Sequence, residues 1–286
     1  MTWWEAVILG LVQGLTEFLP ISSSAHLRVL GELLPHGQDP GAAFTAVVQL
    51  GTEAAVLVYF WKDIVRIVRA WWHALRGKDG PDARARFGSQ SSDARLAWFV
   101  VLGSIPIVVL GVIFKDSIET AFRNLYITAT VLAVFALVLL WADKVGAKNR
   151  ELKELRTRDA VALGLAQAAA LIPGVSRSGG TISMGLFLGL TREAAARYSF
   201  LLAIPAVMGA GLFELVTSYD TLTGEGAPGL VNTIIATVVA FFVGYAVIVW
   251  FLKIITTHSF VGFVIYRIVF AGVIFALLGA GTISAT

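Results

Sequence analysis

Two short polar stretches interrupt apolar parts of this chain, and both carry side chains that can do chemistry. The first, residues 13–28, contains a glutamate, a proline, three serines, a histidine and an arginine. The second, residues 173–183, reads Pro-Gly-Val-Ser-Arg-Ser-Gly-Gly-Thr-Ile-Ser. A carboxylate, hydroxyls and an imidazole can move protons or attack an electrophile, and an arginine among glycines and hydroxyls suits a phosphate. Together the two stretches indicate phosphate-ester or anhydride chemistry.

The first stretch is organised around Glu17. Gln13 lies four residues earlier, on the same face of a helix, and Pro20 ends that helix. A glutamate in apolar surroundings is costly and is a functional candidate by default. We expect Glu17 to hold a hydrated divalent cation, with Gln13 or Glu53 as a further ligand, or to act as a general base. The alternative is a purely structural ion pair of Glu17 with Arg28 or Arg177.

The serines and the histidine of this stretch have two readings each. One of Ser22, Ser23 and Ser24 is expected to cap the next helix, and another is a candidate nucleophile. His26 or Glu17 would then take its proton, although a histidine near apolar sequence is often only hydrogen-bonded. Arg28 is read as an interfacial residue outside the site.

The second stretch is a candidate anion cradle. Its glycines let backbone N–H groups point inward, and the planar fork of Arg177 fits phosphate oxygens. A half-helix over Gly180–Leu190 would add the positive end of its dipole. A flexible loop with an interfacial arginine is the alternative. The predicted substrate-binding residues are Ser22, Ser176, Arg177, Ser178, Gly179, Thr181 and Gln13.

Glu53 lies within a long apolar run. It is expected either to line the same cavity with Gln49 or to form a structural salt bridge.

The composition is that of an integral membrane protein. The chain has 286 residues, of which 57% are hydrophobic and 14% charged, against about 25% charged in soluble domains. The net charge of +3 does not indicate nucleic-acid binding, because the basic residues gather in two short stretches between apolar runs. The absence of cysteine excludes disulfides and thiolate metal sites.

Hydrophobic length predicts an all-α polytopic fold. A bilayer core needs about 20 apolar residues of helix. Six stretches reach that length: residues 44–61, 96–114, 125–142, 197–217, 231–252 and 262–283. Two further regions, 3–34 and 160–191, are cut by the polar stretches into halves too short to cross. Irregular backbone in a membrane must be buried in protein or line a wet cavity, so each region is predicted to be a re-entrant pair of half-helices.

Lysine and arginine set the predicted orientation. They are concentrated in residues 62–95 and 143–159, which are predicted to be cytoplasmic loops, and are absent from residues 218–230, predicted to be outside. Both termini then lie outside. The two polar stretches enter from opposite sides and meet near mid-depth.

This opposition suggests an inverted repeat in a single domain spanning residues 1–286, with repeats over about 1–142 and 160–286. Gly-Leu-Val-Gln before the first loop resembles Gly-Leu-Ala-Gln before the second. Chance similarity is the alternative, and inverted repeats with broken helices also occur in secondary transporters.

At these residues the whole chain resembles the undecaprenyl-diphosphate phosphatase family, also called bacitracin resistance proteins. Two motifs carry the resemblance: Gly-Leu-Thr-Glu-Phe-Leu-Pro-Ile-Ser-Ser-Ser-Ala-His at 14–26, and the second stretch at 173–183. The resemblance implies hydrolysis of undecaprenyl diphosphate to the monophosphate, which recycles the carrier for peptidoglycan synthesis and cell shape and confers bacitracin resistance. It also implies a divalent cation, Mg²⁺ or Ca²⁺, and a site on the outer side of the bacterial plasma membrane.

Carried over by motif, the family's catalytic residues fall on Glu17, Ser23, His26 and Arg177. One departure is Gln13, where many members have glutamate, so a strict two-glutamate metal site is in doubt. The type-2 phosphatidic acid phosphatases are a poor match, because the next histidine after Arg177 is His258.

The implied partners are the polyprenyl diphosphate and membrane lipids, with no nucleic acid. The sequence leaves monomer and homodimer open. A transporter or flippase of polyprenyl phosphate is the alternative function, since a repeat with broken helices fits it equally well.

Overall fold

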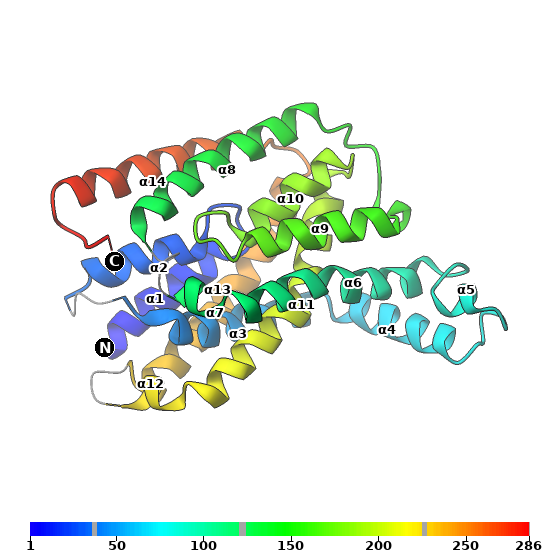
Figure 1. The fold of residues 1–286 in the computed structure, drawn as a ribbon, viewed down its shortest axis with the longest axis horizontal. Helices are drawn as coiled ribbons and strands as arrows, with labels where there is room; N and C mark the ends of the chain where they lie inside the picture. The colour runs from blue at the N-terminus through cyan, green and yellow to red at the C-terminus, as the bar shows by residue number, and fades with distance from the viewer. Residues whose placement is uncertain (36–38, 120–123, 225–227, 286) are drawn as a thin grey trace.

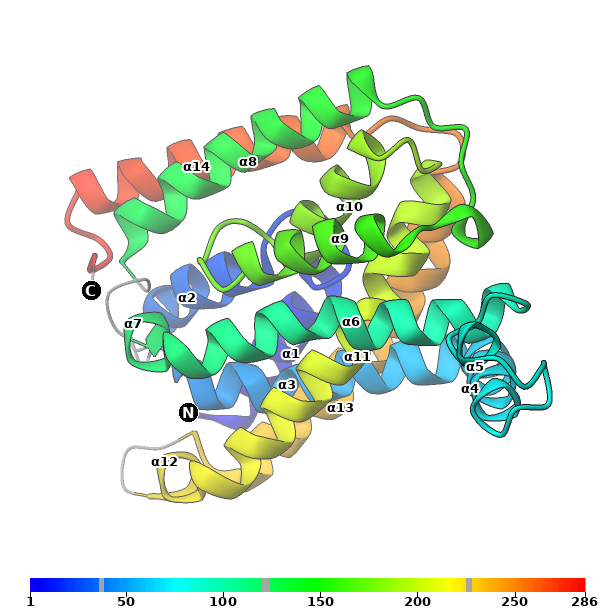
Figure 2. The same cartoon turned by 45° about the vertical axis from the view of Figure 1, so that its right-hand side comes forward.

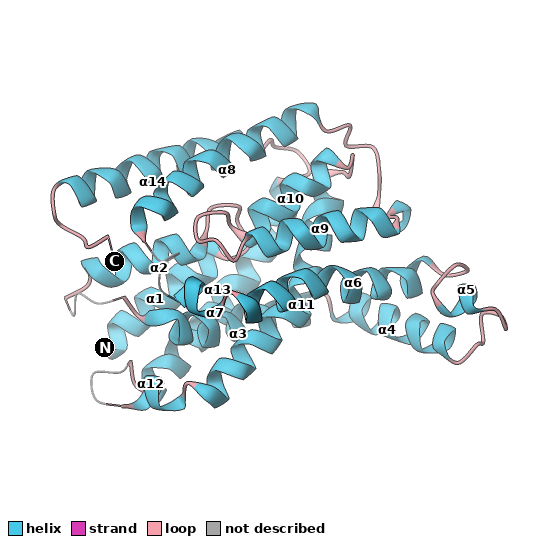
Figure 3. Cartoon of the chain, viewed as in Figure 1, coloured by secondary structure: helices cyan, strands magenta, loops and turns pink. Residues whose placement is uncertain are grey.

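The computed structural model describes residues 1–35, 39–119, 124–224 and 228–285, and the elements named in these ranges are all helices (Figures 1 and 3). Six of them are long and apolar enough to cross a membrane. They are α3 (Gly41–Tyr59), α6 (Ser92–Ile113), α8 (Leu125–Val145), α11 (Arg192–Thr217), α13 (Leu230–Ile254) and α14 (Val261–Gly279). The all-α fold and the six predicted spans are confirmed.

Two spans begin about one turn earlier than predicted. Helix α6 starts at Ser92 and α11 at Arg192, because Ser91 and Thr191 cap them. Each cap oxygen accepts a hydrogen bond from the N–H three residues on, at 3.2 and 3.1 Å. Polar caps and charged first turns lie outside the apolar run, so hydrophobic length alone does not include them.

Four short helices form two pairs: α1 (Trp3–Thr16) with α2 (Ser23–Leu33), and α9 (Thr157–Ala169) with α10 (Arg177–Phe187). They have 14, 11, 13 and 11 residues, too few to cross a hydrocarbon core of about 30 Å at about 1.5 Å per residue. Figure 2 shows that both pairs turn back near the middle of the bundle, where their loops lie close together. That they are re-entrant in a membrane stays a prediction, as does the inverted repeat.

The two ends of the bundle differ in what they carry. In Figure 1 both termini and α12 (Tyr219–Thr223) lie at the left end, and α4 (Trp61–Leu75), α5 (Ala83–Arg86) and the α8–α9 connection lie at the right. The predicted sidedness separates the same segments, although which end faces the cytoplasm stays a prediction. Residues 62–95 were expected to be a loop and are largely helical instead. The remaining short elements are α7 (Lys115–Glu119) and η2 (Leu152–Glu154).

Helix α13 brings the first pair and α3 together, since both α1 and α3 pack against it. Glycine allows the close approach. A Cβ on Gly10 of α1 would lie 2.5 Å from the carbonyl oxygen of Ala236, and one on Gly51 of α3 would lie 2.1 Å from that of Thr237. Any larger side chain at either position would push the helices apart. The polar loop after α1 is therefore held next to the middle of α3.

Candidate active site

Glu17 ends α1 and joins the two polar loops. Its Oε2 accepts hydrogen bonds from Gln13 Nε2 at 2.7 Å and from Ser23 Oγ at 2.6 Å. Its Oε1 forms an ion pair with Arg177 of the second loop. Glu17 is buried, with 7% of the residue exposed. The structure thus brings three predicted catalytic residues, Glu17, Ser23 and Arg177, into one cluster. It also contains the ion pair between Glu17 and an arginine that the sequence offered as the structural alternative.

Ser23 and Arg177 occupy equivalent positions, because each is the first residue of its helix. The residue before each is a serine with a left-handed backbone, with φ of 71° at Ser22 and 68° at Ser176. This conformation is uncommon for residues other than glycine and costs about 1–3 kcal/mol. It turns the chain sharply enough for both helices to begin at the Glu17 carboxylate, where their positive N-terminal ends favour an anion.

The second half-helix was expected to begin at Gly180 and begins three residues earlier. Ser176 is its N-cap, since Ser176 Oγ accepts a hydrogen bond from the N–H of Gly179 at 3.2 Å. This start places Arg177 on the helix rather than in the loop. In the first loop the expected serine cap is wrong: Ser22 is the N-cap residue, but its hydroxyl makes no cap hydrogen bond and contacts Ser24 Oγ at 3.2 Å.

Arg267 of α14 is a residue of the site region that the sequence did not single out. It is fully buried and donates hydrogen bonds to Pro20 O at 2.9 Å in the first loop and to Gly174 O at 2.7 Å in the second. It also reaches the carbonyls of Val175 and Leu132. One guanidinium thus braces both loops. The sequence could have identified Arg267, because an arginine inside an apolar span is a functional candidate by default.

Several predicted substrate-binding groups fasten the loops in this structure. Ser178 Oγ donates to Leu19 O at 2.9 Å, which ties the second loop to the first. The hydroxyl of Thr181 contacts that of Ser199 and donates to a carbonyl of its own helix. A Cβ on Gly179 would lie 2.8 Å from Nη1 of Arg267, so glycine leaves room for the brace.

His26 faces away from the Glu17 cluster. Its Nδ1 is 2.7 Å from the carbonyl oxygen of Ser22, and its Nε2 is 2.7 Å from the hydroxyl of Tyr266 on α14. Its ring stacks on Phe270 with centroids 4.0 Å apart. Across the described ranges, no hydrogen bond joins His26 to Glu17 or Ser23.

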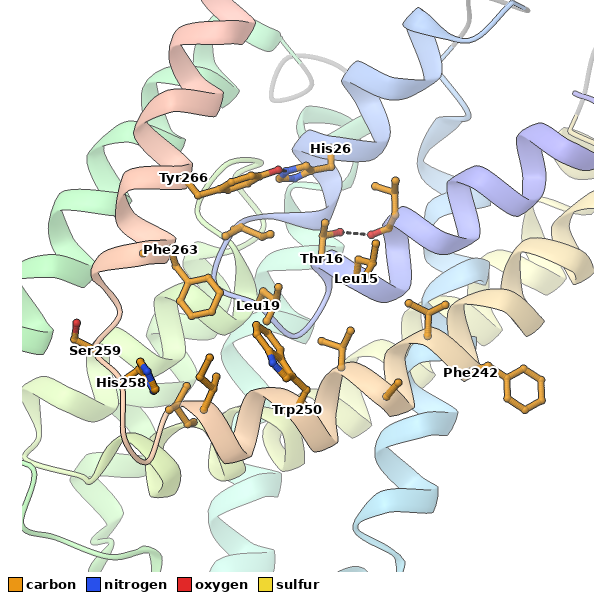
Figure 4. Close-up of a pocket in the computed structure, with 18 residues that line it drawn as sticks. Leu15, Thr16, Leu19, His26, Phe242, Trp250, His258, Ser259, Phe263 and Tyr266 are labelled. Carbon is orange, nitrogen blue, oxygen red and sulfur yellow. Dashed lines mark hydrogen bonds between the residues drawn. The ribbon is translucent and has the colours of Figure 1, made fainter.

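His26 instead lines a cavity of about 1180 Å³ beside the first loop (Figure 4). The cavity lies between α1 with its loop, α13 and α14, and its wall is largely apolar. In Figure 4 Leu19, Trp250 and Phe263 face the same space from these three elements, and the Tyr266 hydroxyl points at His26. Its polar lining includes Thr16, His258 and Ser259, with His26 at the end near the loop.

A divalent cation fits the oxygen atoms near Glu17. Glu53 of α3 is 1% exposed, and neither of its carboxylate oxygens has a hydrogen-bond partner in the part of the chain that the structure describes. Gln13 is fully buried, and its Oε1 is equally unpartnered. No group of three His, Cys, Asp or Glu side chains in the described ranges forms a metal site, so a cation here would draw on the amide oxygen as well. No salt bridge to Glu53 is found among the described residues.

Arg28 lies outside this cluster, as expected. It pairs with Glu32 at 3.1 Å and with Asp39 at 2.6 Å, which leaves Arg177 as the guanidinium that contacts Glu17.

Comparison with known proteins gives one consistent result. The model of the family described as "Bacitracin resistance protein BacA" matches residues 6–273. The undecaprenyl-diphosphatase of Micrococcus luteus is 57% identical over 285 residues, covering 100% of both chains. That of Pseudarthrobacter chlorophenolicus is 58% identical over 287 residues, again with 100% coverage of both. The undecaprenyl-diphosphatase 2 of Agrobacterium fabrum is 59% identical over 288 residues, covering 100% of this chain and 99% of the relative.

Proposed function

We propose, from the premise that this chain belongs to the bacitracin resistance protein BacA family, that it hydrolyses undecaprenyl diphosphate to undecaprenyl phosphate and inorganic phosphate. One observation carries the chemistry: the Glu17 carboxylate holds the Ser23 hydroxyl on one oxygen and the Arg177 guanidinium on the other. A proton acceptor, a nucleophile and an anion clamp are thereby assembled from two loops. The reaction returns the lipid carrier to peptidoglycan synthesis.

Glu17 is the favoured general base. Ser23 Oγ already donates its proton toward Glu17 Oε2 at 2.6 Å, within the range required for proton transfer. When Oγ attacks the terminal phosphorus, the O–P bond forms, the anhydride O–P bond breaks, and undecaprenyl phosphate leaves. Water then hydrolyses the phosphoserine to phosphate. If a water attacks directly instead, the same carboxylate takes its proton. His26 has no comparable contact with Ser23 and is the weaker candidate.

Arg177 is the proposed anion clamp. Its fork matches phosphate oxygens, and it sits at the N-terminal end of α10, where an anion is favoured. Its partner in this structure is Glu17, so binding of the diphosphate requires the guanidinium to exchange one anion for another. Charge stabilisation of this kind is the largest expected contribution to catalysis.

We assign Mg²⁺ or Ca²⁺ as the cofactor, held by Glu17 with a further oxygen ligand from Gln13 or Glu53. When bound, the ion would neutralise charge on the diphosphate. The unpartnered oxygens of Gln13 and Glu53 support this assignment.

The undecaprenyl tail is proposed to lie in the apolar cavity beside the first loop. The cavity is lined by Leu19, which lies between Glu17 and Ser23, and by His26, three residues after Ser23, so a tail seated there would present its diphosphate to the cluster. The many exposed apolar side chains of the spans support placement in a bilayer. We further propose the bacterial plasma membrane, with the site open to the outer side. Assembly as monomer or homodimer stays a prediction.

The alternative of a polyprenyl phosphate flippase is not favoured, since the relatives carry the name of a hydrolase.

Phosphate release from C55 diphosphate by purified protein, with and without chelator, tests the proposal. Glu17→Gln and Ser23→Ala should each slow release by about 10²-fold or more, because general-base and nucleophilic catalysis contribute on that scale. Ser24→Ala is the matched control, since its hydroxyl contacts Ser22 and not Glu17. A trapped phosphoserine would identify Ser23 as the nucleophile. No release with any cation would contradict the phosphatase function.

A further inference from the structure

Glu53 is a buried acid without a structural partner. It lies in the middle of α3 with 1% of its surface exposed, and both its oxygens lack a hydrogen bond within the described ranges. An ionised carboxylate in such a place is expensive unless something compensates it. The catalytic steps assigned above to Glu17, Ser23 and Arg177 make no use of it.

The packing of three helices brings the segments that carry Glu53 and Glu17 together. Phe18 and Thr52, the chain neighbours of the two acids, meet at Gly244 of α13. A Cβ on Gly244 would lie 3.0 Å from the ring of Phe18 and 3.3 Å from the methyl of Thr52. Helices α1 and α3 also contact each other directly.

The charges of this cluster do not balance. Two acids, Glu17 and Glu53, lie on segments that pack together, and within the described ranges the ion pair of Arg177 is with Glu17. With the two oxygens of Glu53, the amide oxygen of Gln13 is a third buried oxygen atom that has no donor within the described ranges. Three hard oxygen atoms with excess negative charge are the ligands that Mg²⁺, Ca²⁺ and Mn²⁺ prefer.

We infer that Glu53 is the second acidic ligand of this chain, completing with Glu17 and the Gln13 amide oxygen a site for one divalent cation. The charge that an acid at position 13 would supply from α1 comes here from α3. A cation on Glu17 and Glu53 also competes with Arg177 for the Glu17 carboxylate, which leaves the guanidinium available to the anionic substrate. The link to catalysis rests on the proposed function, whereas cation binding does not.

Binding of Mn²⁺ to the purified full-length protein in detergent, followed by electron paramagnetic resonance of the free ion, tests this inference. Glu53→Gln should weaken Mn²⁺ binding by about tenfold or more, because the charge count of the ligands sets affinity. Adding Gln13→Glu to that variant returns a carboxylate next to Glu17, and should restore the affinity to within about threefold. Glu214→Gln, which removes a carboxylate of α11 paired with Lys115, is the matched control and should leave binding unchanged.

Equal Mn²⁺ affinity of the wild type and Glu53→Gln would overturn the inference, as would failure of Gln13→Glu to rescue a folded Glu53→Gln protein. If Glu53→Gln does not fold, the single variant Gln13→Glu tests the inference. A third carboxylate in the site should tighten Mn²⁺ binding relative to the wild type, and an unchanged Mn²⁺ affinity would contradict the proposed site. Phosphate release by the wild type is measured in parallel. Mn²⁺ binding without phosphate release would sink the phosphatase function and leave the cation site standing.

Discussion

The α1–α2 loop and the α9–α10 loop have a similar backbone conformation before their second helix, but their side chains carry different charges. Each has a cap serine in the left-handed region, Ser22 or Ser176, which also contacts the hydroxyl of the serine two residues on. Each has a fully buried glutamine nine residues before that serine. Where the first loop has the hydroxyl of Ser23, the second has a guanidinium, and the first alone has an acid four residues after its glutamine.

This difference shows how one loop geometry supports two roles. Both helices begin at the same point, so whatever side chain occupies their first residue meets the Glu17 carboxylate. In the proposed mechanism, the hydroxyl of Ser23 serves as a nucleophile hydrogen-bonded to its base, and the guanidinium of Arg177 serves as the anion clamp. Neither loop alone has both, and the cluster exists only because the two face each other.

Replacing Arg177, the proposed anion clamp of the second loop, should have the largest effect on phosphate release. Arg177→Ala is expected to slow phosphate release by about 10²–10³-fold, since one transition-state donor is worth about 3 kcal/mol or more. Steady-state rates with C55 diphosphate measure it. Arg28→Ala is the control, because that arginine follows the first loop but pairs with Glu32 and Asp39. A rate for Arg177→Ala near that of the wild type would show that the second loop is not the clamp.

Replacing Arg267, which donates hydrogen bonds to both loops, should destabilise both loops at once. Arg267→Ala leaves buried carbonyls of both loops, those of Pro20 and Gly174 among them, without their donor. We expect unfolding to become easier by about 3 kcal/mol. Thermal unfolding in detergent measures the change, with Arg66→Ala at the exposed end of the bundle as control. An unchanged melting temperature would mean that the loops hold each other without Arg267.

Substitution of Gln13 and of Gln167 should give the smallest effects on phosphate release and stability, and the difference between the two should distinguish the loops. Gln13 donates to Glu17, whereas neither amide atom of Gln167 has a partner in the described ranges. Gln167→Leu should therefore change stability by less than about 1 kcal/mol, or raise it, with activity retained. Gln13→Leu should lower phosphate release by roughly tenfold, because a hydrogen bond to a charged group is lost. Equal effects on phosphate release would erase the functional difference between the loops.

Much of the site was predictable because it is local in sequence. Glu17 and Ser23 belong to one motif, and the polar break in each apolar region marked where the loops turn. Hydrophobic length likewise located the six spans. These inferences need only the period of a helix and the thickness of a bilayer.

What escaped prediction depends on which faces of distant helices meet. The direction of His26 follows from Tyr266, some 240 residues later. The position of Glu53 follows from the close packing of α3 on α13 at Gly51 and Gly244, and the hydrogen bonds of Arg267 follow from how α14 packs. The start of α10 was misplaced because its cap serine lies inside the motif that looked like loop.

The hydrogen bonds from Arg267 to both loops have a consequence for the biosynthesis of the protein. The two loops and every side chain of the Glu17 cluster leave the ribosome well before residue 267, since they lie within the first two thirds of the chain. Until α14 is inserted, the carbonyls of Pro20 and Gly174 have no common donor to bring them together. A nascent or truncated chain can therefore hold all the reactive groups and still lack their arrangement. We therefore expect a chain that ends before α14 to show little activity, although Glu17, Ser23 and Arg177 are all present in it.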